Sequence, residues 1–270
     1  MKVKQHYAAP GADDTFLRPE KDNQWAPREI SVCVREDCVW MAWIHRQDGA
    51  EYPVFCCDFG AAGVTLQHLK NQFSYYSKPF FIPSLEYAIP ELAVFAGLGN
   101  SCSLRIYAIR SAGQPVCSQK LSTSCTAVYH VDCLCLSDGS TYILYAGIVS
   151  GKPGIKLFLR RKISGEWLPE EFLEGLAEAY NRPKLSADGL GRVLAVAEAY
   201  QQGKYRICWR ILSETVSSWQ VLYEDPGWNL FPSITTDSGG RLWVSWLHLD
   251  TVRREAVAGL RHQAMLASLT

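Results

Sequence analysis

A repeat of about fifty residues recurs along this chain and constrains its fold more than any other feature. The two clearest copies share both tryptophans and the histidine at matching positions: 242–248 reads LWVSWLH and 39–45 reads VWMAWIH. Three degenerate copies keep the same frame, at 92–98, 142–148 and 193–199. A fixed period of this length is typical of a solenoid or a propeller.

Each repeat predicts four antiparallel strands. The first strand usually follows a proline and ends in a glycine-containing turn, as in 182–189 and 231–240, where Asp-Gly and Ser-Gly-Gly favour a tight reversal. The second strand is the apolar segment, and the third alternates polar and apolar residues, as in 205–209. A weaker fourth strand follows, as in 219–223. The remaining first strands are expected at 27–33, 83–87 and 130–136.

We therefore predict an all-β fold, a single five-bladed β-propeller with four-stranded antiparallel blades. The blades are expected at approximately 27–77, 78–127, 128–179, 180–227 and 228–270, with residues 1–26 helping closure. An unpaired edge would expose backbone groups, so one terminus should supply the last strand. The head, 1–6, is favoured over the tail, 264–269. An alternative interpretation places short helices at 64–69 and 170–178 as insertions.

Composition excludes several partner classes. Lys and Arg total 27 and Asp and Glu total 27, so the chain has no net charge, and neither nucleic acid nor an anionic membrane is an expected partner. No apolar run is long enough to span a bilayer, and the first residues lack the apolar stretch of a secretory signal. The ten cysteines include no Cys-x-x-Cys pair, and several alternate with aliphatic residues as small hydrophobes. We expect a cytoplasmic protein with no metal and no cofactor.

The first-strand turns carry a family resemblance. The pattern Pro-x-apolar-x-x-Asp-x-x-Gly, followed by an apolar strand, occurs in 182–199 and 231–246. It resembles the sialidase-like, Asp-box-repeat β-propeller superfamily, which includes arabinanase-type glycoside hydrolases and propeller lectins. The resemblance implies carbohydrate as the ligand class. Asp237 and Gly239 match only the first half of an Asp box, and they fall between the inner strands of a blade, so we interpret them as a turn signal.

The expected binding face collects the starts of the first strands around the central opening, where a propeller usually binds its ligand. In each repeat we take the residue that directly follows the first-strand proline, or the residue that replaces this proline. These residues are Arg28, Ser84, Asp132, Lys184 and Ser233. The predicted ligand-binding residues combine aromatic and charged groups: Trp25, Arg28, Tyr129, His130, Tyr180, Arg182, Lys184 and Trp228. An aromatic face can stack on a sugar ring, but the same rings could instead pack between blades as core.

A hydrolase would need two carboxyl groups facing each other across the sugar. The candidates for catalytic residues are Glu29, Asp132 and Glu198. Glu198 stands in an otherwise apolar strand, where burial would raise its pKa toward that of a general acid. The alternative is that it pairs with a neighbouring Arg or Lys, such as Lys184. Arabinanase-type enzymes would be expected to carry an Asp near the first inner strand, where this chain has Arg28 and Glu29, and that departure weakens the hydrolase hypothesis.

These patterns predict a lectin-like, carbohydrate-binding propeller whose partner is a glycan or a small polar ligand. One alternative is a glycoside hydrolase of the sialidase or arabinanase type. Another is a non-enzymatic scaffold for protein partners, which predicts a broad exposed apolar patch. The sequence sets no oligomeric state.

Overall fold

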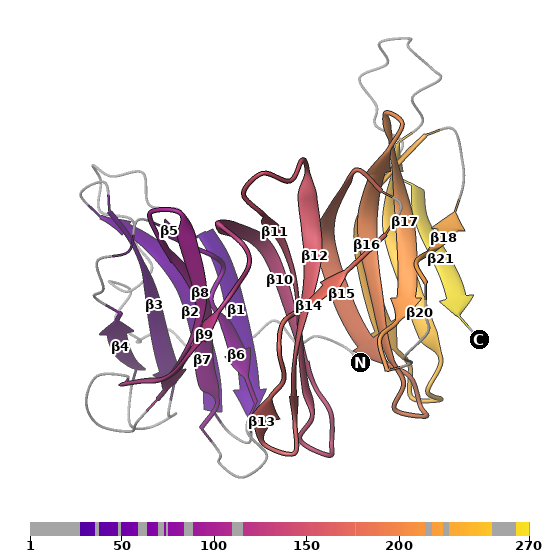
Figure 1. The fold of residues 1–270 in the computed structure, drawn as a ribbon. Coiled ribbons are helices and arrows are strands. Elements are labelled where there is room, and N and C mark those ends of the chain that lie inside the picture. Colours follow the sequence, from indigo (N-terminus) through magenta and orange to yellow (C-terminus); the bar gives the residue numbers. More distant parts are fainter. Residues whose placement is uncertain are drawn as a thin grey trace, which may run out of the picture.

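The fold comes from a computed structural model and consists of β-strands. The structure describes residues 28–35, 38–47, 50–58, 64–69, 73, 75–83, 89–109, 116–175, 177–213, 218–223, 227–249 and 263–269. Within these residues there is no helix, and the strands form five antiparallel sheets (Figure 1). The predicted all-β class is therefore confirmed.

The sheets follow the order of the chain. The first contains β1 (Arg28–Arg35), β2 (Cys38–Gln47), β3 (Ala50–Asp58) and β4 (Val64–His68). In the second, β5 (Tyr75–Tyr76) and β6 (Phe80–Ile82) both pair with β7 (Glu91–Leu98), which is followed by β8 (Ser101–Ala108) and β9 (Val116–Ser122). The third contains β10 (Ala127–Cys135), β11 (Thr141–Ile148) and β12 (Ile155–Ile163), with β13 (Glu166–Trp167) and β14 (Glu171–Leu173) both paired with β12.

The last two sheets repeat this order. The fourth contains β15 (Ala179–Ala187), β16 (Val193–Gln201), β17 (Lys204–Ile211) and β18 (Gln220–Tyr223). The fifth contains β19 (Trp228–Thr236), β20 (Leu242–Leu249) and β21 (Gln263–Leu269).

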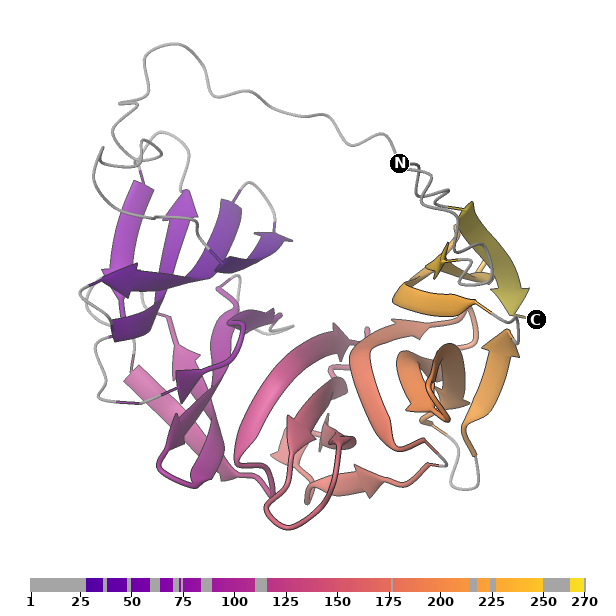
Figure 2. The ribbon, with the colours of Figure 1, turned by 90° about the horizontal axis from the view of Figure 1, so that it is seen from above.

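The five sheets lie along an arc around a common centre (Figure 2). The strands that open the sheets touch in sequence, β1 with β6, β6 with β10, β10 with β15 and β15 with β19, so these inner strands line the centre. Among the described strands, no sheet joins the fifth to the first. The favoured closing segment, 1–6, lies outside the described residues. The tail pairs with β20 as the third strand of the fifth sheet, while the third strand expected at 255–259 lies outside the described residues.

The core lies in the seams between consecutive sheets. β7 shows why the second strands are apolar throughout: Leu92 and Val94 face the first sheet, whereas Ala93 and Phe95 face the third. A strand with sheets on both sides buries both of its faces, so it reads as a continuous apolar run. The seam between the third and fourth sheets is built in the same way, around residues such as Leu144 and Leu159.

Two sequence expectations about single elements were wrong. The alternative helices at 64–69 and 170–178 do not form; β4 pairs with β3, and β14 pairs with β12. Free edges of neighbouring strands override the weak helical periodicity there. The first strand of the second sheet was expected at 83–87, but that role falls to β5 and β6, and Ser84 lies outside the described residues.

The glycine turns between the inner strands behave as turn signals. The Asp237 carboxylate accepts hydrogen bonds from the Gly239 and Arg241 backbone amides and from the Trp243 indole, at 2.9, 3.0 and 2.9 Å. These donors, the indole foremost, lower the pKa of Asp237 to about 2. Asp188 holds the equivalent turn of the fourth sheet through the Leu190 and Arg192 amides. The half Asp box is therefore a turn between inner strands, as its place in the repeat predicts.

Candidate functional site

The inner strands share a β-bulge near their starts. The pairing register shifts between Val128 and His130 in β10, between Asn181 and Lys184 in β15, and between Leu230 and Ser233 in β19. Within these bulges Arg182 and Phe231 adopt positive φ angles of 44° and 56°. Non-glycine residues rarely take this conformation, and such strain is concentrated at functional sites. The bulges therefore mark the centre of the arc as the candidate site.

Beyond the bulges, the pairing registers define one equivalent position on four of the inner strands. The registers give this position to Asp132, Lys184 and Ser233, paired with Leu144, Val196 and Ser245. In β1 the equivalent residue is Ser31, which pairs with Ala42, rather than the expected Arg28. The Ser31 hydroxyl donates to the Pro79 carbonyl at 2.7 Å and so joins the first sheet to the second.

Asp132 is the central acidic group. Its Oδ2 accepts the Leu185 N–H at 2.8 Å, and its Oδ1 lies 3.6 Å from the Lys184 Nζ. Burial raises the pKa of Asp132, and this outweighs the opposite effect of Lys184 and Lys78. A carboxyl group with a raised pKa is suited to exchanging a proton.

His130 lies on the same strand and is surrounded by cations. Burial lowers its pKa, and Arg182, Lys184 and Lys78 lower it further. The ring is therefore held in its neutral form, which can both donate and accept a hydrogen bond. The sequence pointed to His130 and Lys184, but not to Lys78, because the second inner strand was placed too late in the chain.

Glu198 is completely buried, with 0% of its side chain exposed. Arg182 Nη1 donates to both of its carboxylate oxygens, at 3.1 and 3.0 Å, and the Phe231 N–H donates to Oε1 at 2.6 Å. The Arg182 guanidinium carbon lies 4.2 Å from the centroid of the Phe231 ring. Glu198 therefore ties the bulge of β15 to the bulge of β19. The expected alternative of a buried ion pair is what the structure contains, with Arg182 as the partner instead of Lys184.

The aromatic candidates separate into two groups. Tyr129 and Trp228 are 42% and 40% exposed, and Phe231, which the sequence did not single out, is 53% exposed. Tyr180 is only 3% exposed and packs against Trp219 in the seam between sheets, with ring centroids 5.5 Å apart. The signal that could have found Phe231 is its place before Pro232, which repeats Arg182 before Pro183.

Trp25, Arg28 and Glu29 complete the set of predicted site residues. Trp25 lies outside the described residues. Arg28 and Glu29 belong to β1 by their backbone, and their side chains lie outside the described set.

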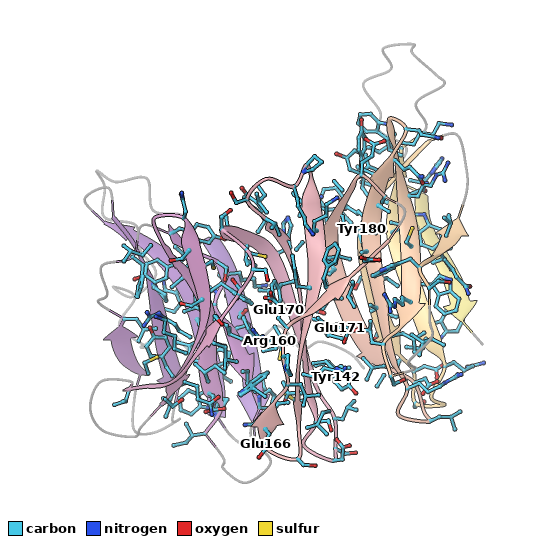
Figure 3. The ribbon with its side chains drawn as sticks, viewed as in Figure 1. Tyr142, Arg160, Glu166, Glu170, Glu171 and Tyr180 are labelled. Carbon is cyan, nitrogen blue, oxygen red and sulfur yellow. The ribbon has the colours of Figure 1, made fainter. Side chains whose placement is uncertain are left out.

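A second acidic group, Glu170, lies in the seam between the second and third sheets (Figure 3). The Tyr145 hydroxyl donates to its Oε1, and the Ser124 N–H donates to its Oε2 at 2.8 Å. Burial and the Glu170 charge raise the pKa of the Tyr145 phenol, which stays protonated. Glu170 thus joins two sheets and lies away from the inner-strand bulges.

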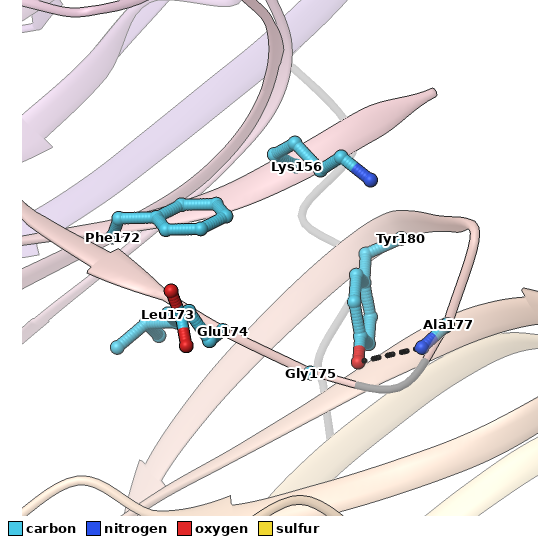
Figure 4. A pocket seen from close by; sticks show the side chains of 7 residues that line it. All are labelled: Lys156, Phe172, Leu173, Glu174, Gly175, Ala177 and Tyr180. Atoms are coloured by element: carbon cyan, nitrogen blue, oxygen red, sulfur yellow. Dashed lines mark hydrogen bonds between the residues drawn. The ribbon is translucent and has the colours of Figure 1, made fainter. Parts of the chain in front are cut away.

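A pocket of about 200 Å³ opens between the third and fourth sheets (Figure 4). It is lined by Lys156, Phe172, Leu173, Glu174, Gly175, Ala177 and Tyr180. The Tyr180 hydroxyl accepts the Ala177 N–H at 3.3 Å, and a side chain at Gly175 would collide with that hydroxyl. Tyr180 thus faces this pocket and the core, not the centre of the arc.

Across the described residues, no group of three or more His, Cys, Asp and Glu side chains is arranged to hold a metal ion. Nor does the described part of the chain contain a helix with the length and apolarity needed to cross a membrane.

Comparison with known proteins identifies the fold through structure alone. No protein-family model matches the chain, and no curated protein matches its sequence. A Dyadobacter fermentans protein of unknown function has a TM-score of 0.57 at 10% identity, covering 82% of this chain and 75% of that one.

Two further solved structures are glycoside hydrolases. The α-L-arabinanase of Penicillium chrysogenum, complexed with arabinobiose, has a TM-score of 0.54 at 11% identity, covering 81% and 76% of the two chains. The GH93 α-L-arabinofuranosidase of Fusarium graminearum, also with arabinobiose, has a TM-score of 0.56 at 9% identity, covering 82% and 76%. These neighbours are β-propellers, so the chain has a β-propeller-like fold that distantly resembles the arabinanase type.

Proposed function

We propose that this chain is a five-bladed β-propeller that binds carbohydrate on the face formed by the inner-strand starts. The observation that carries the proposal is the central group of Asp132 and Lys184, 3.6 Å apart, on the two strands whose starts also hold His130 and Arg182. The five sheets around one centre support the number of blades.

The chemistry of this face suits a polyhydroxylated ligand. Asp132 accepts hydrogen bonds, Lys184 donates them, and neutral His130 can do both. Exposed Tyr129 and Trp228 lie at the starts of β10 and β19 and offer apolar faces to the C–H groups of a sugar ring. The central positions hold an acid, Asp132, a base, Lys184, and two serines, Ser31 and Ser233, so we expect one asymmetric site instead of a repeated set.

A second candidate function is glycoside hydrolysis, which the arabinanase and arabinofuranosidase neighbours favour over a lectin. Asp132 would be its first carboxyl group, because its pKa is raised and its side chain is 27% exposed. Glu29 is the remaining candidate for the second. Glu198 is a poor one, since its oxygens are buried and engaged by Arg182 and Phe231, whereas a catalytic acid must reach the substrate.

A glycan-array screen of the purified protein, followed by incubation of each bound glycan and analysis of the products, tests both candidates. We expect binding in the wild type and loss of binding in Asp132→Asn. Asp138→Asn is the matched control, because Asp138 lies in the turn at the far end of the same strand. Cleavage that disappears in Asp132→Asn would establish the hydrolase. Absence of binding to every glycan would contradict the proposal.

A further inference from the structure

We propose that the stacked side chains of Arg182 and Phe231 form a ligand-contact element of the central face, and that Glu198 acts as its positioning residue. The inference rests on the proposed carbohydrate binding. It assigns a recognition role to Phe231, and it replaces the catalytic role considered for Glu198.

The side chains of both Arg182 and Phe231 are accessible. Phe231 is 53% exposed, and the Arg182 side chain is 34% exposed. Nη1 of Arg182 makes the two hydrogen bonds to Glu198, so the N–H groups on Nε and Nη2 are not used in that contact. The pair therefore presents an aromatic ring beside guanidinium donors.

The Arg182–Phe231 pair is held in place at a conformational cost. Both residues adopt positive φ angles, and an ordinary strand start would need neither of them. Glu198 offsets the cost by accepting from the Arg182 side chain and from the Phe231 backbone. The single carboxylate thus fixes two bulges on neighbouring sheets with respect to each other.

The stacked Arg182 and Phe231 side chains fit one class of ligand. The guanidinium stacks on the Phe231 ring, and Phe231 is still 53% exposed, so the accessible part of the ring forms an apolar platform. A sugar can place its C–H face on such a platform and direct a ring substituent oxygen to the Arg182 N–H groups. We therefore assign the pair to a sugar ring that carries an oxygen acceptor at its edge.

The test is isothermal titration of a glycan selected by the array against the wild type and a set of single variants. We expect Phe231→Leu, which keeps an apolar side chain, and Arg182→Lys, which keeps the charge, each to weaken binding at least tenfold. Phe172→Leu is the matched control, because Phe172 is 37% exposed but lies on β14, away from the inner strands. Its affinity should equal that of the wild type.

Glu198 needs a readout that a purely structural role would not change. In the wild type, the glycan should shift the Nε–H resonance of Arg182 in NMR spectra. In Glu198→Gln, which keeps the side-chain shape, this shift should be lost while circular dichroism stays native. If Glu198→Gln does not fold, Arg182→Lys and Phe231→Leu still decide the assignment.

The outcomes separate the inference from the proposed function. Glycan binding that stays unchanged in both Phe231→Leu and Arg182→Lys overturns the inference and leaves the carbohydrate proposal standing. A wild type that binds no glycan overturns both.

Discussion

The seam around Glu170 and the seam around Glu198 each hold a carboxylate between two sheets, but the two carboxylates have different hydrogen-bond partners. Each seam brings a carboxylate between two sheets, Glu170 between the second and third and Glu198 between the fourth and fifth. Glu170 is bound by a neutral phenol and one backbone amide. Glu198 is bound by a guanidinium and by the amide of a strained residue.

The difference shows that the partners of a carboxylate between two sheets, and not its place there, indicate its role. The Glu170 contacts hold ordinary strands and loops together, which is a structural task. The Glu198 contacts hold the exposed Phe231 and the partly exposed Arg182 at the centre of the arc. Removing the two carboxylates should therefore have different consequences for stability and for ligand binding.

The largest expected effect belongs to Glu198→Ala. Removing this carboxylate leaves Arg182 and the Phe231 amide without their partner, and breaking a buried pair in this way costs about 3–5 kcal/mol. Urea denaturation should report that loss. Glu171→Ala is the control: Glu171 forms a half-exposed ion pair with Arg161, so its loss should cost less than about 1 kcal/mol. Equal losses in the two variants would contradict the stabilising role assigned to the buried Glu198 carboxylate.

A second prediction concerns the opposite end of the inner strands in the Glu198 seam. Gly189 N donates to Gly240 O at 2.9 Å, and a Cβ on Gly189 would lie 2.9 Å from the Gly240 Cα. Gly189→Ala should therefore separate the two turns and cost about 1–3 kcal/mol, measured by urea denaturation. Gly191→Ala and Gly203→Ala meet no atom within 4 Å, but their φ angles of 78° and 77° are strained for alanine, so these two variants measure backbone strain without a steric contact. Gly189 does not adopt a positive φ, so Gly189→Ala measures the steric contact.

A third prediction concerns the Glu170 seam. Tyr145→Phe removes the hydroxyl that donates to Glu170 and should cost about 1–3 kcal/mol, because the carboxylate loses a buried donor. Thermal or urea unfolding will show the loss, and glycan affinity should not change. Weaker glycan binding in folded Tyr145→Phe would mean that this seam also shapes the site.

The smallest expected effect is the contribution of His130 to the pH dependence of the unfolding free energy. The folded pKa of His130 lies below its ordinary value of 6.5, so near and below that pH the unfolded state binds more protons. His130 should therefore contribute stability that is present above pH 6.5 and lost as the pH falls through its folded pKa. Urea unfolding between pH 8 and pH 5 should show a steeper loss for the wild type than for His130→Asn. The raised pKa of Asp132 acts in the opposite direction in both proteins, so it cancels from the difference. Parallel pH profiles would be the contrary result.

The strands that repeat most clearly were the ones that the sequence predicted best. Segments 39–45 and 242–248 lie within β2 and β20, and the Asp237 turn joins β19 and β20 as its spacing indicates. Such strands are easy to predict from sequence because burial on both faces gives them a continuous apolar run, and few other structures have this pattern. The outer strands β4 and β14 are only five and three residues long, so their local periodicity suggested helices there.

The site was only partly visible in the sequence for a geometric reason. Asp132, His130 and Lys184 could be found because they occupy the start of the inner strands in the repeat frame. The contact between Arg182 and Glu198 depends on a bulge that shifts the pairing, and the residue-before-proline repeat at Arg182 and Phe231 does not give the size of that shift. Lys78 was missed because the second sheet splits its inner strand into β5 and β6.

The central claim is that carbohydrate binds where the inner strands begin, and the indole resonances of Trp228 and Trp219 test it most directly. Trp228 lies at the start of β19 and is 40% exposed, whereas Trp219 packs on Tyr180 in the seam between sheets. Titration of an array-selected oligosaccharide into ¹⁵N-labelled protein should shift the Trp228 indole N–H and leave Trp219 in place. A saturable shift confined to Trp219, with Trp228 unmoved, would contradict the account.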